Sequence, residues 1–303
     1  MYDTVKLWQS SDQLNRGYLS WMPTILSDVS LHQKQNGVEY LTGKLDNLNI
    51  SVSVAGFSLN GSLNKFWHKD NFKKITRQEV KHCVEMLEDL LRVELRTAEV
   101  KRFDIAHNFI MESPTKDYYH LLGESSRYNR LSQANSVYYN NGLRTKLFYD
   151  KVMEGKARGY EIPQIWKHKN VLRYELRFTG RLPAQFNKKN VIIKDLFDEE
   201  FYISSIDYWI KEYMEIKKNK LLMPSVIHMT SKDAKDYLLS ALIEMLGQNQ
   251  VTTIADAWKP NFTTPKEAQR FKNSLKNLKD LNAESPLMAE LDKKILMVKE
   301  YYR

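Results

Sequence analysis

Three segments of the chain, 101–109, 145–151 and 172–178, alternate polar and apolar residues with a period of two. Successive side chains of a β-strand point to opposite faces of the sheet, so this alternation is typical of strands with one buried face and one open face. It constrains the fold more than any other feature of the sequence. It predicts an antiparallel sheet that is packed on one face and polar on the other.

The polar positions of these three segments carry charged residues and one tyrosine. Alternate counting puts Asp104 on the polar side of its strand, and it puts Tyr149 and Lys151 on one face of the next strand. Glu175 lies between two arginines on one face of the last strand. If the three strands belong to one sheet, its open face collects Asp104, Tyr149, Lys151, Arg173, Glu175 and Arg177.

This set of side chains suits phosphodiester chemistry. The carboxylates of Asp104 and Glu175 supply the oxygen ligands that Mg²⁺ or Mn²⁺ prefers, and cationic side chains would hold phosphate oxygens. A free tyrosine has a pKa of about 10. Attack by Tyr149 near neutral pH therefore needs a base or a nearby cation, and Lys151 could be that cation. The same pattern also fits an ordinary half-buried sheet with a ladder of surface charges.

Further strands are expected before and between these segments. Alternation over residues 38–66, with turn signals at Asn47 and at Asn60-Gly61, indicates a run of antiparallel strands. Another strand-like segment covers residues 136–140. Together these segments predict that the N-terminal part of the chain is built on one antiparallel sheet.

Helical patterns complete the N-terminal part and dominate the C-terminal part. Apolar residues at helical spacing predict an amphipathic helix over 76–91 with Thr76 as its N-cap, and a short helix near 116–122. Beyond residue 182, four helices are expected at about 199–217, 231–246, 265–278 and 285–302. The expected class is α+β, with helices packed on one face of the sheet, followed by a mainly α-helical region. We place the domain boundary between 182 and 200, giving domains 1–185 and 186–303.

Composition favours a soluble protein with an anionic partner. Lys and Arg number 46 against 37 Asp and Glu, and the resulting net charge of +9 favours nucleic acid. Every apolar run is far shorter than the roughly 20 residues that span a bilayer, and the N-terminus lacks the pattern of a secretory signal. The single cysteine, Cys83, permits neither an intrachain disulfide nor a thiolate metal cage, and we expect it to be buried.

Five short motifs occur in a fixed order between residues 2 and 177. They are Tyr2-Asp3-Thr4-Val5-Lys6-Leu7, Asn60-Gly61-Ser62-Leu63-Asn64-Lys65-Phe66, Val100-Lys101-Arg102-Phe103-Asp104, Leu147-Phe148-Tyr149-Asp150-Lys151 and Leu172-Arg173-Tyr174-Glu175-Leu176-Arg177. Together they resemble the gene II/X family of phage and plasmid replication initiators. The resemblance covers the N-terminal part of the chain.

The resemblance implies a rolling-circle initiator. Such an enzyme nicks one strand at a replication origin, stays attached to the 5′ phosphate through a tyrosine, and later rejoins the displaced strand. Motif by motif, it implies that Tyr149, Lys151 and Arg173 are catalytic and that Asp104 and Glu175 bind Mg²⁺ or Mn²⁺. A phosphotyrosine keeps the energy of the broken bond, so rejoining needs no nucleotide cofactor, in agreement with the absence of a G-x-x-x-x-G-K-[ST] loop.

The resemblance also implies partners and a separate role for each of the two domains. The partners are supercoiled and single-stranded origin DNA and the helicase, single-strand binding protein and polymerase of a bacterial host, in the cytoplasm and without a membrane. Residues 1–185 would be the catalytic nickase domain. The helical domain 186–303 could bind origin DNA, with a possible helix-turn-helix within 252–278.

Basic and amide side chains are candidates for DNA contacts. The expected contacts are Asn64, Lys65, Arg102 and Arg177. Further candidates are Lys73, Lys74, Arg77, Lys156 and Arg158 near the nick, and Lys217, Lys218, Lys220, Arg270, Lys272, Lys276 and Lys279 in the helical domain. A solvated surface is the ordinary alternative for each group.

One motif of many rolling-circle nucleases is missing, and two other functions stay open. The seven histidines form no His-hydrophobic-His pair, and alternation sends His107 to the apolar face. Tyr138 and Tyr139 raise the possibility of a second nucleophile, although packing or base stacking explains them equally well. The alternatives are a non-catalytic DNA-binding regulator on the same scaffold and a related relaxase or transposase.

Overall fold

The computed structural model describes residues 1–219, 230–246, 248–276 and 285–301. The chain divides into two compact units, one formed by residues 1–217 with 290–303 and the other by 218–289. The domain boundary that we expected after residue 185 does not coincide with this division. Helix α7 (Glu199–Met214) follows that position, yet it packs on strand β6 and belongs to the first unit.

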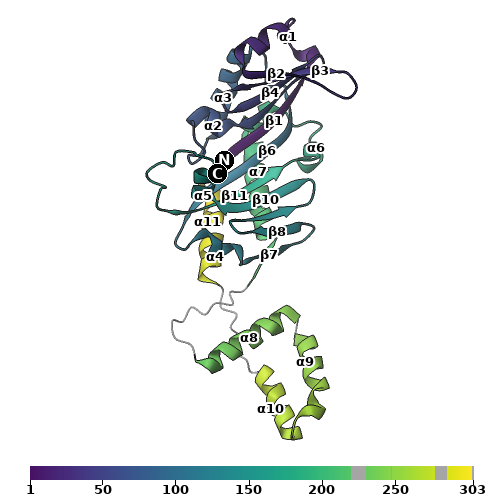
Figure 1. Ribbon diagram of the computed structural model, residues 1–303, viewed down its shortest axis with the longest axis vertical. Coiled ribbons are helices and arrows are strands. Elements are labelled where there is room, and N and C mark those ends of the chain that lie inside the picture. The colour runs from purple at the N-terminus through teal and green to yellow at the C-terminus, as the bar shows by residue number, and fades with distance from the viewer. Residues whose placement is uncertain (220–229, 247, 277–284, 302–303) are drawn as a thin grey trace. The chain divides into compact units, whose positions relative to one another are not determined.

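A ten-stranded antiparallel sheet forms the centre of the first unit (Figure 1). Its strands are β1 (Tyr2–Ser10), β2 (Ser27–Gln33), β3 (Glu39–Leu45), β4 (Leu48–Ser53), β5 (Gly56–Ser62), β6 (Glu99–Met111), β8 (Asn129–Gln133), β9 (Ser136–Asn140), β10 (Arg144–Asp150) and β11 (Asn170–Phe178). They follow the order β2-β3-β4-β5-β1-β6-β11-β10-β9-β8. A small second sheet pairs β7 (Leu122–Ser125) with β12 (Ile216–Lys218).

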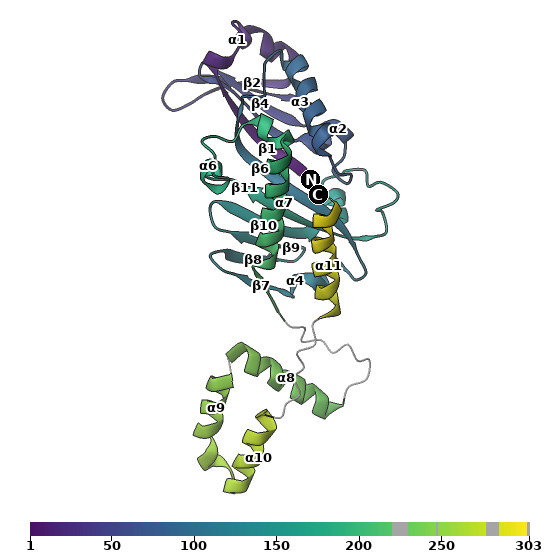
Figure 2. The same cartoon turned by 180° about the vertical axis from the view of Figure 1, so that it is seen from behind.

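Helices cover one face of the large sheet (Figure 2). Helix α3 (Arg77–Leu91) begins with a capping box between Thr76 and Glu79, and its apolar stripe, including Cys83, is buried as expected. Helix α7 stacks on the sheet through aromatic rings, with the centroids of Tyr174 and Trp209 4.5 Å apart. Helix α11 (Pro286–Tyr301) also lies on this side. The α+β class is confirmed. The long helices lie on this one face, but the opposite face of the central strands is partly covered too, because Phe72 and Val152 pack on Val171 of β11. We keep the name open face for this opposite, polar side of the sheet.

The remaining helices are short or belong to the second unit. In the first unit these are α1 (Tyr18–Trp21), α2 (Leu63–His68), α4 (Thr115–Tyr119), α5 (Lys151–Ala157) and α6 (Leu182–Gln185), with 3₁₀ turns at Ser11–Gln13, Met22–Ile25 and Ile193–Phe197. The second unit contains α8 (Ser231–Leu246), α9 (Gln248–Ala257), a 3₁₀ turn at Lys259–Asn261 and α10 (Pro265–Lys276). The expected mainly helical C-terminal region is confirmed.

A helix-turn-helix within 252–278 stays a prediction. The second unit packs Val251 and Ala255 of α9 against Leu275 of α10. Residues 258–264 connect these helices, a longer link than the turn of about 3–4 residues that the motif prefers. Residues 277–278, together with Lys220 and Lys279 of the basic set, lie outside the described residues.

One expected turn was wrong. Asn60-Gly61 lies inside β5, and the chain reverses instead at residues 54–55. Gly61 serves close packing, because a Cβ atom there would lie 2.9 Å from the backbone oxygen of Asn47. The strand run also ends earlier than expected, since α2 begins at Leu63. The side chain of Ser62 caps this helix by accepting a hydrogen bond of 3.1 Å from the Lys65 backbone N–H.

Candidate active site

The strand register gathers the expected site residues on the open face of β6, β11 and β10. Arg173 of β11 lies opposite both Asn108 of β6 and Tyr149 of β10. Two residues along, Glu175 shares this face, and Asp104 pairs with Arg177. Paired residues of antiparallel strands point to the same side, so alternate counting placed these side chains correctly.

Arg173 is the centre of this cluster and is buried. Its Nη2 donates to Oδ2 of Asp3 at 2.5 Å, and its Nε donates to Oε2 of Glu175 at 3.4 Å. Its Nη1 donates to Oδ1 of Asn108 at 3.0 Å and to the backbone oxygen of Asn71 at 3.3 Å. A buried arginine bound by two carboxylates is a rigid cation, because each of its three guanidinium nitrogens donates at least one hydrogen bond.

Asp3 is a site residue that counting along the three later strands could not find. The register between β1 and β6 shifts between Tyr2 and Val5, and this bulge turns Asp3 toward Arg173. Ser62 donates a hydrogen bond of 2.5 Å to Oδ1 of Asp3. Burial by itself would raise the pKa of Asp3, but Arg173 and Ser62 lower it below the usual value. The carboxylate is thereby held ionised. The signal in the sequence was its place in the first of the five motifs.

Tyr149 is partly exposed at the edge of this cluster, and its Oη donates to Oε2 of Glu175 at 3.4 Å. Burial raises the pKa of the phenol well above its usual value, and the negative charge of Glu175 adds to the rise, whereas Arg173 opposes it. The phenol is therefore neutral near pH 7. Glu175 is the acceptor that is in place to receive its proton.

Lys151 does not share a strand face with Tyr149, so that expectation was wrong. Strand β10 ends at Asp150, whose side chain caps α5 by accepting from the Met153 N–H at 2.8 Å. Lys151 is therefore the first residue of a helix. Its Nζ is buried, lies 2.7 Å from Oε2 of Glu154, and is 5.9 Å from the centre of the Tyr149 ring. The lysine is near Tyr149, as expected, but Glu154 neutralises much of its charge.

Arginines bind both carboxylates that we expected to hold a metal. Arg102 donates from Nε and Nη2 to the two oxygens of Asp104, at 2.8 and 2.6 Å. Arg177 donates to Oε1 of Glu175 at 2.6 Å. Burial raises the pKa of Asp104 to about 7, against the effect of the Arg102 hydrogen bonds, and the charge of Glu175 raises it further.

This arrangement does not fit a divalent cation as it stands. The oxygens of Asp104 and Glu175 are of the type that Mg²⁺ prefers, but their lone pairs point to guanidinium groups. Within the described part of the chain, no group of three or more His, Cys, Asp and Glu residues could hold a metal ion. We therefore derive no chemical step through a metal.

The four expected DNA contacts differ in accessibility. Asn64 is buried and donates to the backbone oxygen of Lys73 at 2.7 Å, so it mainly fixes the loop after α2. Lys65 is half-buried, and its Nζ lies 3.8 Å from the centre of the Tyr160 ring. The side chains of Arg102 and Arg177 are 28% and 31% exposed, so both guanidinium groups can meet a ligand from outside while they bind a carboxylate.

Of the other residues considered from the sequence, His107 and Tyr139 lie away from the cluster, whereas Tyr138 shares its face. His107 pairs with Tyr174 on the face opposite the cluster, and burial lowers the pKa of its imidazole well below the usual value. Tyr139 is buried and donates to the backbone oxygens of Leu122 and Gly123. Burial raises the pKa of Tyr139 to about 12, which makes it a packing residue. Tyr138 lies opposite Leu147 and shares the open face.

The fold and the site define a class of α+β proteins in which an antiparallel sheet is covered by helices on one side and carries a tyrosine within an arginine-carboxylate network on the other. Residues 1–205 match the family described as the N-terminal region of the gene II replication-associated protein of filamentous phages. The chain therefore belongs to this family of phage replication initiators, as the five motifs indicated. Comparison with curated proteins finds no match. Among the described helices, none combines the length and apolar character needed to cross a membrane.

Proposed function

We propose that this replication protein starts rolling-circle synthesis by nicking one strand of origin DNA through Tyr149. The observation that carries the proposal is the hydrogen bond from Tyr149 Oη to Glu175, whose carboxylate is fixed by Arg173 and Arg177. A tyrosine, a carboxylate that can accept its proton and fixed cations thus meet on the same face of the sheet. Membership of the phage replication initiator family supports DNA replication as the setting.

In the proposed step, Tyr149 Oη attacks the scissile phosphorus. The phenol proton passes to Glu175, the bond from phosphorus to the 3′ oxygen breaks, and a 5′ phosphotyrosine forms. The leaving 3′ oxygen takes a proton from solvent. Arg177 and Arg102 are partly exposed and would bind the phosphate oxygens, where negative charge grows during attack. Arg173 would hold Glu175 in place and stabilise charge on the phenolate oxygen.

The same groups would run the reverse reaction when the strand is rejoined. A free 3′ hydroxyl attacks the phosphotyrosine and gives its proton to solvent, Glu175 returns its proton to the leaving oxygen of Tyr149, and the phosphodiester is restored. The energy of the original bond is kept in the tyrosine ester, so the cycle needs no nucleotide cofactor. A partner DNA polymerase would extend the 3′ end between the two steps. We also propose the host helicase and single-strand binding protein as partners.

A divalent cation is a separate part of the proposal. Mg²⁺ or Mn²⁺ would bind Asp104 and Glu175 only after Arg102 and Arg177 release them, for example to DNA phosphates. Mn²⁺ binding measured by electron paramagnetic resonance, with and without a single-stranded oligonucleotide, tests this order. Equal and weak binding by wild type, Asp104→Asn and Glu175→Gln in both conditions would remove the metal assignment.

The principal test traps the protein on DNA. The full chain is incubated with overlapping single-stranded oligonucleotides that tile the replicon encoding it, in Mg²⁺ and in Mn²⁺, and covalent adducts are mapped by mass spectrometry. We expect one cleaved sequence and a phosphotyrosine at Tyr149. Tyr149→Phe should lose the adduct, whereas Tyr138→Phe, which changes another tyrosine of the open face, should keep it. Full cleavage by Tyr149→Phe would refute the assignment.

A non-catalytic regulator is the second candidate. The observation in its favour is that arginines already bind the buried carboxylates in pairs, as they would in a purely structural network. If the chain is such a regulator, it should retard an origin duplex in a gel but form no covalent adduct in the presence of Mg²⁺ or Mn²⁺. A relaxase or transposase would form the same adduct at a different DNA target. The helical region 186–303 is our proposed origin-binding part, and Arg270→Ala, which changes an exposed residue of α10, should weaken duplex binding.

A further inference from the structure

A second tyrosine, Tyr160, is tied to Tyr149 by a short helix. Helix α5 starts two residues after Tyr149 and ends at Ala157, a length of about 10 Å. Its C-terminus forms a Schellman motif, in which the Gly159 N–H donates to Lys156 and the Tyr160 N–H donates to Gly155 at 2.9 Å. Gly159 has a φ of +69°, the left-handed conformation that this motif needs. Tyr160 therefore has a defined place at the end of α5.

The chain after Tyr160 is fastened to the same helix. Ile162 and Trp166 pack against a core of Phe72, Val152 and Val171. A Cβ atom on Gly155 would lie 2.5 Å from Cδ1 of Ile162, so this glycine permits the close approach of the loop to α5. Hydrophobic anchors on both sides of the loop keep Tyr160 from being a free surface tyrosine.

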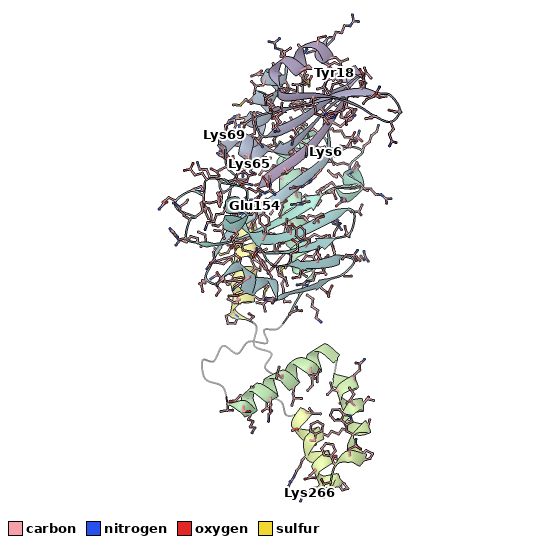
Figure 3. All side chains as sticks on the ribbon, viewed as in Figure 1. Lys6, Tyr18, Lys65, Lys69, Glu154 and Lys266 are labelled. Carbon is pink, nitrogen blue, oxygen red and sulfur yellow. The ribbon has the colours of Figure 1, made fainter. Side chains whose placement is uncertain are left out.

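Two cations lie against Tyr160. The Nζ of Lys65 lies 3.8 Å from the centre of its ring, and Lys65 comes from α2, a different element (Figure 3). The guanidinium of Arg158 is held by Glu154, with Nε 2.6 Å from Oε1. A hydrogen bond with Lys65 lowers the pKa of the Tyr160 phenol, burial opposes this, and Arg158 lowers it further. The side chain stays accessible, because Tyr160 is 39% exposed.

The same cations connect Tyr160 with the cluster around Tyr149. A hydrogen bond with Tyr160 raises the pKa of Arg158, and Tyr149 lies close enough that its phenol, when ionised, would raise the pKa of Arg158 further. Lys65 also lowers the pKa of Asp3, although less than Arg173 does. The two tyrosines therefore lie near the same set of cations, but their phenols differ in how easily they ionise. Burial raises the pKa of Tyr149, whereas Tyr160 is the phenol that ionises more easily.

We propose that Tyr160 is a second acceptor of DNA phosphate, used while Tyr149 is occupied by the first strand. This inference rests on the proposed function of Tyr149. A single nucleophile cannot cleave a newly made origin before it has released the strand that it already holds. A second phenol about one short helix away, with cations to receive a phosphate, removes this obstacle.

The second step is a balanced transesterification. The Tyr160 phenol gives its proton to solvent, and its oxygen attacks the phosphorus of the regenerated origin. The bond from phosphorus to the 3′ oxygen breaks, a Tyr160 phosphate ester forms, and the leaving 3′ oxygen takes a proton from solvent. The new 3′ hydroxyl then attacks the phosphate on Tyr149, whose oxygen leaves as the displaced strand is closed into a circle. The number of phosphate esters does not change.

The test counts adducts on one chain. The reactive oligonucleotide found for Tyr149 is synthesised with a 3′ bridging sulfur at the nick, so that the thiol released by cleavage reverses the reaction poorly. The full chain is treated with an excess of this substrate, and intact mass and peptide mapping give the number and sites of adducts. We expect two adducts on one chain, at Tyr149 and Tyr160, and the doubly modified fraction should fall to background in Tyr160→Phe.

Tyr40→Phe is the matched control, because Tyr40 is a partly exposed tyrosine with Lys34 5.8 Å from the centre of its ring. It should give two adducts like wild type. A wild-type chain that takes one adduct at Tyr149 and never a second at Tyr160 overturns the inference and leaves the proposed function intact. Absence of any adduct at Tyr149 overturns the proposed function itself. Double modification that persists in Tyr160→Phe also overturns the inference, because another residue then accepts the second strand.

Discussion

Replacement of Arg173 tests whether the charged cluster is one interdependent unit. Arg173→Met keeps much of the side-chain volume but removes the cation that binds Asp3 and Glu175. Removing one partner of a buried ion pair costs about 3–5 kcal/mol, because an uncompensated charge stays behind. A domain of this size loses about 2–4 °C in Tm for each kcal/mol. We therefore expect the unfolding temperature of the first unit to fall by about 6–20 °C.

The loss of stability in Arg173→Met should depend on pH, because Arg173 changes the pKa of Asp3. In the wild type Arg173 lowers the pKa of Asp3, so the pair contributes stability above the unfolded pKa of about 3.9 and loses it as pH falls through the lower folded value. Without Arg173, burial raises the pKa of Asp3, and the variant can take up a proton on folding. The difference in stability between wild type and variant should therefore be largest near pH 7–8 and shrink toward about pH 4.

Urea unfolding followed by circular dichroism at several pH values measures this difference. Arg77→Met is the matched control, because Arg77 binds Glu199 at 2.8 Å on the surface and should cost at most about 1 kcal/mol. Arg173→Lys keeps a positive charge and should fall between the two, which preserves the test if Arg173→Met does not fold. A loss of stability in Arg173→Met that is as small as in Arg77→Met, or that does not vary with pH, would refute the reasoning.

Three further predictions concern other buried groups. Lys146→Met should destabilise the protein by about 3–5 kcal/mol in urea unfolding, because Lys146 is buried and binds Glu212 at 2.7 Å; a loss below about 1 kcal/mol would contradict it. Gly56→Ala should lower the free energy of unfolding by about 3 kcal/mol in the same assay. Gly56 has a φ of +141°, and a Cβ atom there would lie 2.1 Å from the backbone oxygen of Gln9. A variant as stable as the wild type would contradict this prediction. Asp104 has a pKa of about 7 in the folded protein and about 3.9 when unfolded, so folding binds a proton between these values. Wild-type Tm should therefore fall more steeply than that of Asp104→Asn from pH 5 to 8, and parallel curves would refute this.

Alternation predicted the open face well because it depends only on local backbone geometry. In β6 and β11 every second side chain points the same way, so Asp104 and Glu175 could be assigned to faces without knowledge of their neighbours. The same reasoning failed at Lys151 and at Gly61. Asp150 offered the backbone a helix cap that competes with the strand, and Gly61 serves packing against a neighbouring strand rather than a turn.

The sequence by itself determined the α+β class, the polar face, the family and the choice of Tyr149. The tertiary structure decided what surrounds that tyrosine. Arg173 meets Asp3 across 170 positions of sequence, and Lys65 reaches Tyr160 from a separate helix. Alternation and capping follow from neighbouring residues, whereas the charge and proton affinity of a buried group depend on whichever side chains the sheet brings within a few ångströms. That is why Tyr149 could be proposed as the nucleophile from the sequence, while its hydrogen bond with Glu175 and the cations around Tyr160 emerged only from the folded protein.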